Sequence, residues 1–311
     1  LTVDGTGTAI DLSGIDLTID GEAGKDEVVF EGTVTTGNLT VNAESITVSG
    51  TLDAADVTLN AEAEDDGAVD QDGEYLGGVF QGLYIATPEA RIDLSGATIT
   101  ASGAVDLDAT ATTTLSTTPS SLGGAVDATL LTLLPVADIL LDGTTLSAAS
   151  VAADATVNVT ADFEDESDSS DTDSQADAAV SVVVVASDAT VTATGATAIQ
   201  SGGAVALNAA TNLDITSTAD GGADGSAVGA TVAVTEISAD TGVEVSGSTS
   251  IGALGGDTPD AITLGATLTS DVETVATSTA GGSQEGDGSS ESQQRLEDPN
   301  DDGDTGDQAQ S

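Results

Sequence analysis

A unit of about fifty residues recurs along this chain, and it constrains the fold more than any other feature. Tripeptides such as "LNA" and "LDA" carry Asn60, Asp108, Asn158 and Asn208 in the middle position, at steps of 48, 50 and 50 residues. A similar tripeptide around Asn42 precedes Asn60 by only 18 residues. A fixed period of this kind is typical of chains that stack one structural unit on the next.

Two further markers follow the same step. The segments "DLSG", "LLDG", "TATG" and "EVSG" are separated by 47, 52 and 52 residues, and they end at Gly96, Gly143, Gly195 and Gly247. Apolar runs recur in the same order, at 77–86, 128–137, 178–187 and 227–236. Three markers that recur with the same spacing over about 150 residues indicate a true internal repeat.

Within each unit, apolar side chains alternate with Thr, Ser or Asn, as in "LTVNAESITVSG" (39–50) and "ATVTATGATAI" (189–199). This alternation predicts half-buried strands, and the Gly, Asp and Asn residues between them mark turns. The 18-residue step matches one coil of a parallel β-solenoid, so we expect each unit of about fifty residues to hold two or three coils. The small apolar residues imply a narrow core.

The sequence therefore predicts an all-β fold, a right-handed parallel β-helix (β-solenoid) over residues 1–280. Asn60, Asp108, Asn158 and Asn208 should occupy equivalent positions in their coils and form a ladder of amide hydrogen bonds. The alternative is that these residues only favour turns.

Dense carboxylate blocks interrupt the strand pattern. They lie at 61–74, 161–177 and 218–226, and the last part of the chain, 281–311, has no strand pattern. We expect the blocks to be acidic loop insertions that leave the solenoid. Residues 281–311 should form a disordered acidic C-terminal tail or a truncated loop, and we expect the chain to be a segment of a longer protein.

Composition excludes several classes of function. The chain has 54 acidic and only 3 basic residues, a formal net charge of -51, and neither His nor Cys. Without His or Cys it lacks thiol nucleophiles, Ser-His-Asp triads and the usual zinc ligands, so we predict that it is not an enzyme. The lack of clustered positive charge argues against nucleic acid. The apolar run 129–141 is too short to span a bilayer and contains Pro135 and Asp138, which argues against direct membrane insertion.

Two acidic groups are candidates for binding Ca²⁺, the one cofactor we consider. The segment "DPNDDGD" (298–304) matches the start of a calcium loop, with candidate ligands Asp298, Asn300, Asp302 and Asp304. Its twelfth position is Ala309, where such loops carry a bidentate Glu. The second candidate set is Asp165, Asp168, Asp171 and Asp173. The alternative is a solvated polyanion with diffuse counterions.

One group of aromatic residues is a candidate for binding sugars. Tyr75, Phe80 and Tyr84 lie close together in sequence, and Arg91 follows them. Aromatic platforms and basic groups are what a saccharide site needs. The alternative is that the aromatic side chains cap or plug the wall of the solenoid.

The segments 202–222, 225–253 and 292–307 resemble the giant repetitive surface proteins of Gram-negative bacteria. These are the filamentous-haemagglutinin-like adhesins and the β-strand-repeat proteins of the type associated with LEPR-XLL domains. The resemblance implies an extracellular or cell-surface rod or stalk with a structural or adhesive role, and it transfers no catalytic residue. Expected partners are surface glycans or neighbouring copies or segments of the same giant protein.

The alternative function is a polysaccharide-binding β-helix module, with polysaccharide degradation ranked below binding. A third interpretation concerns the environment. Dense surface carboxylates repel one another less in concentrated salt, so the composition also suits a saline setting.

Overall fold

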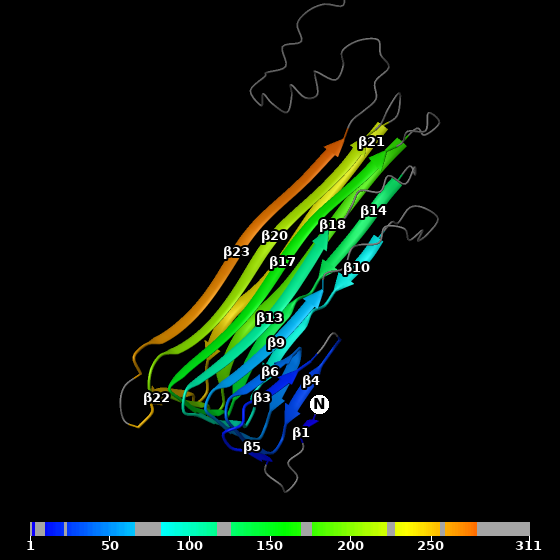
Figure 1. Cartoon of the computed structure of the whole chain (residues 1–311). Coiled ribbons are helices and arrows are strands. Elements are labelled where there is room, and N and C mark those ends of the chain that lie inside the picture. The colour runs from blue at the N-terminus through cyan, green and yellow to red at the C-terminus, as the bar shows by residue number, and fades with distance from the viewer. Residues whose placement is uncertain are drawn as a thin grey trace, which may run out of the picture.

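The computed structural model describes residues 2–3, 10–21, 24–65, 82–116, 126–168, 176–222, 228–255 and 259–278. All regular structure in these ranges is β-strand, and all strand pairs are parallel. The strands form three sheets, which the chain visits in the same order seven times. The all-β, parallel prediction is therefore confirmed, and the arrangement is that of a β-solenoid (Figure 1).

Sheet 1 is the first sheet of each coil. Two of its coils contribute a broken strand, so it has nine strands. They are β1 (Thr2–Val3), β4 (Glu27–Phe30), β7 (Ser45–Val48), β10 (Gly82–Ala86), β11 (Glu89–Asp93), β14 (Val126–Leu133), β15 (Val136–Asp142), β18 (Ala176–Thr194) and β21 (Val228–Val245).

Sheet 2 is short in every coil, whereas the strands of sheet 3 lengthen from 4 residues in the first coil to 19 in the fifth and have 18 and 17 residues in the last two. Sheet 2 contains β2 (Ile10–Leu12), β5 (Thr33–Thr36), β8 (Thr51–Ala54), β12 (Thr98–Ala101), β16 (Thr145–Ala148), β19 (Ala198–Ser201) and β22 (Ser250–Ala253). Sheet 3 contains β3 (Leu17–Asp20), β6 (Leu39–Ala43), β9 (Val57–Asp65), β13 (Ala104–Ser116), β17 (Ser150–Asp168), β20 (Val205–Gly222) and β23 (Ile262–Ser278).

The prediction that each fifty-residue unit holds two or three coils is wrong, because one unit is one coil. In sheet 2, Thr33 pairs with Thr51, an 18-residue coil, but Thr51 pairs with Thr98 and Thr98 with Thr145, coils of 47 residues. The extra residues lengthen the strands of sheets 1 and 3. Alternation has the same period in a short strand and in a long one, so it does not encode strand length.

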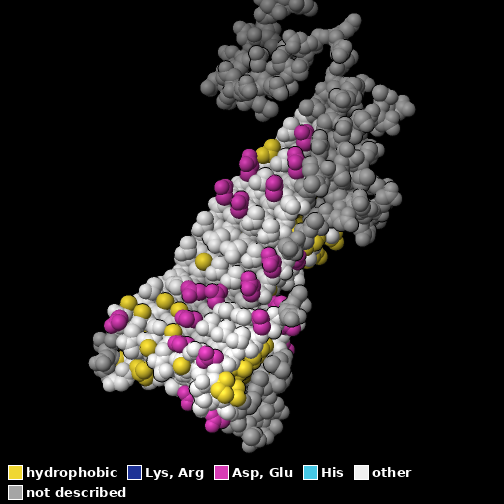
Figure 2. Space-filling model, in the orientation of Figure 1, with side chains coloured by type: hydrophobic (Ala, Val, Ile, Leu, Met, Phe, Trp, Pro, Cys, Tyr) yellow, Lys and Arg dark blue, Asp and Glu magenta, His cyan; other side chains and the backbone are white. Residues whose placement is uncertain are grey.

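The long strands make the molecule widen from its N-terminal coils to its C-terminal coils, as the colour sequence in Figure 1 shows. β18 and β20 have 19 and 18 residues, which corresponds to about 60 Å at roughly 3.3 Å per residue. Sheets 1 and 3 face each other along these strands, where β18 packs against β20. Carboxylates are spread over the face of the rod in Figure 2.

The core is one continuous column of inward side chains from successive coils. Leu59, Leu107, Ala153 and Leu207 pair in register along sheet 3, and all four are buried. The core is narrow, as predicted, because small residues let the two sheets approach. The Ser181 and Ser217 hydroxyls, for example, lie 2.8 Å apart across the core and join sheet 1 to sheet 3.

The turn between sheets 1 and 2 depends on the predicted glycine marker. Gly96, Gly143, Gly195 and Gly247 all adopt a positive φ of 63 to 73°. Only glycine adopts this conformation without strain, because it has no Cβ to collide with the backbone. The marker spacing therefore follows from one turn repeated in four successive coils.

Three of the four residues predicted to form a ladder share one column, but hydrogen bonds join only part of that column. The outer-face column in sheet 3 comprises Asp20, Asn42, Asn60, Asp108, Asp154 and Asn208. The Nδ2 atoms of Asn42, Asn60 and Asn208 donate to the preceding coil at 3.2, 2.9 and 2.8 Å. Most acceptors are Asp rather than Asn, because Asp20 and Asp154 occupy two of the rungs.

Asn158 does not occupy this column, so its predicted equivalence is wrong. Asp154 takes the expected place, and Asn158 lies four residues further along β17, where it pairs with Thr112 and Asn212. It accepts a hydrogen bond of 2.9 Å from Asn212 and so begins a second, shorter ladder. A shift of four residues keeps a side chain on the same face of a strand, so the sequence pattern did not separate the two columns.

The acidic blocks begin inside strands rather than in loops. β9 continues to Asp65, β17 to Asp168 and β20 to Gly222. Glu62 and Glu64, for example, point outwards from β9 while the intervening Ala61 and Ala63 are buried. Carboxylates at alternate positions are compatible with a strand that has one solvated face. Residues 66–74, 169–175 and 223–226 of these blocks, and residues 281–311, lie outside the described residues.

Candidate functional site

A groove lies on the side of the solenoid where the short coils meet the long ones. We call it the shoulder groove, and its volume is about 450 Å³. It is lined by Gly24, Lys25, Asp26, Glu27, Glu44, Ser45, Ala63, Glu64, Asp65, Thr87, Pro88, Glu89 and Arg91. These residues come from the ends of strands in sheets 1 and 3, so the groove occupies the corner where the chain passes from one sheet to the other.

The step in coil length creates this groove. β6 ends at Ala43 and β7 begins at Ser45, so the second coil turns from sheet 3 to sheet 1 with one intervening residue. β9 continues past this turn to Asp65, and the chain re-enters sheet 1 through β10, before β11. The ends of the longer strands therefore project beyond the short coil and leave a ledge beside it.

The groove gathers most of the chain's few cations. Only three basic residues occur in the chain, and two of them, Lys25 and Arg91, line it. The third, Arg295, lies outside the described residues. Six carboxylates line the same groove, those of Asp26, Glu27, Glu44, Glu64, Asp65 and Glu89. The site is therefore rich in both hydrogen-bond donors and acceptors but is acidic overall.

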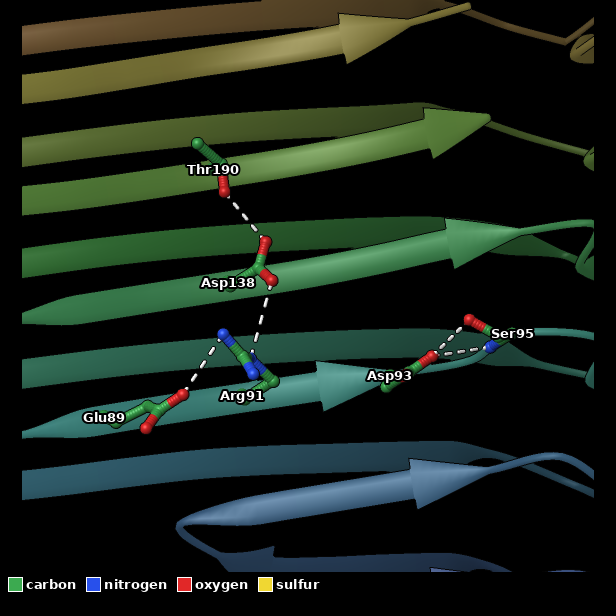
Figure 3. A network of polar contacts seen from close by, with 6 residues as sticks. All are labelled: Glu89, Arg91, Asp93, Ser95, Asp138 and Thr190. Carbon is green, nitrogen blue, oxygen red and sulfur yellow. Dashed lines mark hydrogen bonds and ion pairs between the residues drawn. The ribbon is translucent and has the colours of Figure 1, made fainter. Parts of the chain in front are cut away.

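Arg91 is held on the outer face of β11 by partners from its own and the next coil (Figure 3). Its Nη2 atom lies 3.1 Å from Oε1 of Glu89, and its Nε atom lies 3.6 Å from Oδ2 of Asp138. The Thr190 hydroxyl donates to the other oxygen of Asp138 at 2.8 Å. About half of the Arg91 side chain remains exposed, so the guanidinium is positioned but accessible.

Two further interactions fix the carboxylates of the groove. The backbone N–H of Asp26 donates to Oε2 of Glu44 at 2.6 Å, which ties the first coil to the second. The Tyr84 hydroxyl donates to Oδ1 of Asp65. Glu44 and Asp65 are thus acceptors already oriented by the protein, which lowers the entropic cost of binding a ligand there.

The predicted aromatic cluster is only partly described, and sugar binding by it stays a prediction. Tyr84 packs its ring against the hydrophobic core, and its hydroxyl donates a hydrogen bond to Asp65, which lines the groove. This position matches the alternative interpretation, in which an aromatic side chain plugs the wall. Tyr75 and Phe80 lie outside the described residues.

The calcium candidates are mostly outside the described residues. Asp298, Asn300, Asp302, Asp304, Asp171 and Asp173 are in that category. Asp165 and Asp168 belong to β17, not to a loop. Within the described ranges no group of three or more acidic residues is arranged to hold a metal ion, so calcium binding stays a prediction.

Two carboxyl groups elsewhere on the surface, those of Asp188 and Asp106, have a raised pKa. Partial burial, reinforced by the neighbouring carboxylates of Asp240 and Asp138, raises the pKa of Asp188, while Arg91 and Thr190 act in the opposite direction. Partial burial and the carboxylates of Asp56 and Asp154 likewise raise the pKa of Asp106. Neither carboxyl group lines the shoulder groove.

The groove offers both donors and acceptors to a polar ligand. Carboxylates, a guanidinium and an ammonium group can together hydrogen-bond a ligand with many hydroxyl groups. The sequence did not predict this groove, because Lys25 and Arg91 are 66 positions apart and only the step in coil length brings them together. Arg91 was singled out only as a neighbour of the aromatic residues.

No protein-family model, curated protein or solved structure matches the chain. Within the described ranges, the structure contains no helix that could cross a membrane.

Proposed function

We propose that the chain is a structural or adhesive segment of a large secreted or cell-surface bacterial protein, acting as a repetitive rod or stalk. The observation that carries this proposal is the register of the coils: three sheets run through all seven coils, a buried core runs through the second to the sixth, and one glycine turn recurs in four successive coils. Stacked coils of this kind bury a continuous core and make a stiff, elongated body.

The proposal includes a right-handed coil. Parallel strands joined by crossovers within a sheet follow that hand in about 98% of known cases, because of the intrinsic twist of strands. It also includes an extracellular or cell-surface location. The resemblance to surface adhesins and the dense carboxylates support this location, since a strongly charged surface keeps a long rod soluble.

Immunolabelling of intact cells tests the proposal. Antibodies raised against the folded chain should label intact cells of the source organism as strongly as permeabilised ones. Pulling single molecules by their ends should in addition give unfolding events of roughly one coil each, because each coil contacts mainly its neighbours. Labelling that requires permeabilisation, together with unfolding in one step, would contradict a surface rod.

A second candidate function is saccharide binding in the shoulder groove. The specific observation in its favour is the convergence of Lys25 and Arg91, two of only three basic residues in the chain, on one groove with oriented carboxylates. With six carboxylates against two cations, the groove favours neutral or amine-bearing sugars over acidic polysaccharides.

Calorimetric titration with neutral and amino-sugar oligosaccharides tests this second function. Arg91→Gln should weaken binding about tenfold, the scale of one charge-assisted hydrogen bond. Asp93→Asn is the control on the same strand. Asp93 accepts hydrogen bonds from the N–H and hydroxyl of Ser95 and does not line the groove. Equal effects of the two substitutions would assign the binding to the general surface.

We further propose that the chain has no catalytic activity. Its support is the absence of His and Cys from the sequence and the position of Asp106 and Asp188 away from the groove. Incubation with pectin, alginate and chondroitin-type substrates should give no product. Turnover that disappears when a single carboxylate is replaced would refute this part of the proposal.

A further inference from the structure

One strand of sheet 1 has a free edge in the middle of the rod. Within the part of the chain that the structure describes, β10 pairs with β14 alone and lies at the margin of the sheet (Figure 1). The preceding strand of the sheet is too short to be its neighbour, because β7 begins only at Ser45 and pairs with β11. The edge therefore results from the step in coil length, and it does not depend on where the chain begins or ends.

The backbone of β10 presents polar groups at this edge. The carbonyl of Ala86 accepts a hydrogen bond of 2.8 Å from the N–H of Leu134, so the backbone of Ala86 faces β14. Successive residues of a parallel strand bond to opposite neighbours, so the N–H and C=O groups of Leu83 and Ile85 point the other way. Arg91 belongs to the same alternating series, and its N–H does find a partner, 2.9 Å away in the preceding coil. Leu83 and Ile85 have no such neighbour within the described ranges.

This edge lacks the features that usually prevent edge pairing. Natural proteins protect exposed edges with charged side chains, Pro or very short strands. Gly82–Ala86 contains neither a charged residue nor Pro, and its outward side chains Leu83 and Ile85 are 58% and 55% exposed. The projecting end of β9, in contrast, carries Glu62 and Glu64 beyond its last pair with β6. An unprotected apolar edge in so acidic a chain indicates a place where another strand adds.

We propose that β10 binds an extended, cationic segment of a partner outside this chain, which adds to sheet 1 as a further strand. In this mode of recognition main-chain hydrogen bonds supply affinity, and alternate side chains supply specificity. The outward side chains of the ligand lie beside Leu83 and Ile85 and should be apolar. Its inward side chains lie beside Tyr84 and Ala86 and should be small, because the core is narrow.

The shoulder groove determines the charge of this partner. The edge of β10 leads into the groove, since Thr87, Pro88 and Glu89 follow β10 directly and line the groove. Six carboxylates and two cations line it, so the end of the added strand that reaches the groove should carry Lys or Arg. The inference rests on the step in coil length and is independent of the proposed function.

The described surface and the rest of the chain do not offer a matching segment. The three basic residues are Lys25, Arg91 and Arg295, and the first two already line the groove. Residues 66–81 contain four carboxylates and no basic residue, and 281–311 contain Arg295 among many acidic residues. A second copy would bring a net charge of -51 to an acidic groove and would be repelled. The charge therefore selects a partner of different composition.

Fluorescence anisotropy with a labelled peptide tests the proposal at about 0.15 M salt, which screens diffuse attraction to the polyanion. The probe is a blocked peptide of Val-Thr repeats followed by Lys-Arg-Lys. Methylation of one alternate set of its backbone nitrogens should weaken binding at least tenfold, and methylation of the other set less than threefold, because only one set faces β10. Replacing Lys and Arg by Glu should also weaken binding at least tenfold. Equal effects of the two methylated sets would overturn the proposal, because the contact would then depend on charge alone.

Substitutions in the protein test the same contact from the other side. Ile85→Pro removes an edge donor but leaves the pairing with β14 intact, because the N–H of Ile85 points away from β14. It should weaken peptide binding at least tenfold, and Ile85→Val, which retains the donor, should have a clearly smaller effect. Glu64→Gln/Glu89→Gln should weaken binding more than the control Asp93→Asn/Asp11→Asn, which removes the same charge outside the groove.

Two further measurements separate this ligand from other occupants. Arg91→Gln should weaken saccharide binding but strengthen peptide binding, because it removes a positive charge beside the ligand's Lys and Arg. In hydrogen exchange followed by nuclear magnetic resonance, the peptide should slow exchange of the Leu83 and Ile85 amides at least tenfold. Slow exchange of these amides without peptide would overturn the proposal, because the chain itself or a second copy would then occupy the edge. Undiminished binding to Ile85→Pro would also overturn it, and circular dichroism establishes that each variant is folded.

Discussion

At the scale of single residues, the turn glycines differ in what surrounds them although their φ angles agree. A Cβ on Gly143 would meet no atom within 4 Å, so only the positive φ opposes a side chain there. A Cβ on Gly247 would lie 2.8 Å from the backbone oxygen and 2.9 Å from the backbone nitrogen of Gly195. The turns of the last two coils therefore stack in direct contact.

This contrast predicts different costs for one substitution. Gly143→Ala should destabilise by about 1–2 kcal/mol, the cost of a non-glycine residue in the left-handed region. Gly247→Ala should cost more, because the backbone of Gly195 must also move. Urea denaturation followed by circular dichroism measures both, and equal losses would show that stacking contributes nothing at this turn.

The ionisation of one carboxyl group, that of Asp188, should make the stability of the fold depend on pH. The pKa of Asp188 is raised in the fold, and one of its oxygens is shielded from solvent without a hydrogen-bond partner in the described part of the chain. A raised carboxyl pKa means that the ionised group destabilises the fold above that pKa, and that the cost disappears as the pH falls below it. Asp188→Asn should therefore stabilise the protein at pH 7 by up to about 1 kcal/mol, the scale of two like charges near 4 Å in water.

The gain should shrink as the pH falls from 7 towards about 4, the ordinary pKa of Asp. Asp11→Asn is the matched control. Hydrogen bonds from the hydroxyl and N–H of Ser13 lower the pKa of Asp11, which is exposed. Its removal should not stabilise the fold at pH 7. Thermal melts across this pH range measure the gain in stability. If the gain of Asp188→Asn does not change with pH, ionisation of Asp188 is not its cause.

At the scale of strands, one column of inward-facing apolar side chains in sheet 3 contains a polar residue, Thr113. Thr113 lies on the inner face of β13 and pairs with Val159, which in turn pairs with Leu213. The Thr113 hydroxyl is buried and has no hydrogen-bond partner among the described residues. The Thr211 hydroxyl in the same sheet differs, because it accepts a bond of 2.7 Å from Thr241 across the core.

Thr113→Val should stabilise the protein by about 1 kcal/mol, because it removes an unsatisfied buried hydroxyl and keeps the side-chain shape. Thr211→Val should not stabilise it, since it leaves Thr241 without this partner. The change in free energy of unfolding, from chemical denaturation of both variants, checks the pair. Loss of stability in Thr113→Val would indicate a partner for that hydroxyl, such as an ordered water.

Strand identity was predictable from sequence, whereas strand length was not. The alternation in "LTVNAESITVSG" correctly marks β6 and β7, and the glycine marker correctly locates the turns before sheet 2. The 18-residue step between Asn42 and Asn60 is a real coil, but it belongs to the short N-terminal part. Nothing in a period of two says whether a strand continues for five residues or eighteen, so the later coils were predicted too small.

At the scale of the whole molecule, the wrong coil length also prevented prediction of the candidate site. The shoulder groove exists because a short coil is followed by a long one, so its residues cannot be grouped without the coil lengths. Lys25 and Arg91 carry no sequence signal of proximity, and Glu44 and Asp65 look like ordinary surface acids. The net charge of -51, in contrast, can be calculated from the composition alone.

Cations must compensate this net charge, either as mobile counterions or at specific sites. Two like charges 4 Å apart repel by about 1 kcal/mol in water, and the blocks 61–74 and 161–177 place many carboxylates close together in sequence. Diffuse screening would act equally for any divalent cation. A true site would prefer Ca²⁺, because Ca²⁺ accepts six to eight oxygen ligands in flexible geometry and Mg²⁺ requires a near-ideal octahedron. Carboxylates, amide oxygens and backbone carbonyls, which the segment 298–304 offers, are ligands of this kind.

We expect calcium-selective, saturable heat in the millimolar range typical of extracellular modules, at fixed ionic strength. Asp298→Ala/Asp302→Ala should abolish that heat if the segment 298–304 is the site. Asp93→Asn/Asp11→Asn also removes two negative charges, from exposed or half-buried positions elsewhere, and should leave it unchanged. Equal heats for Ca²⁺ and Mg²⁺ in all three proteins would instead establish a polyanion surrounded by mobile counterions, because general screening depends on the number of charges and not on their arrangement.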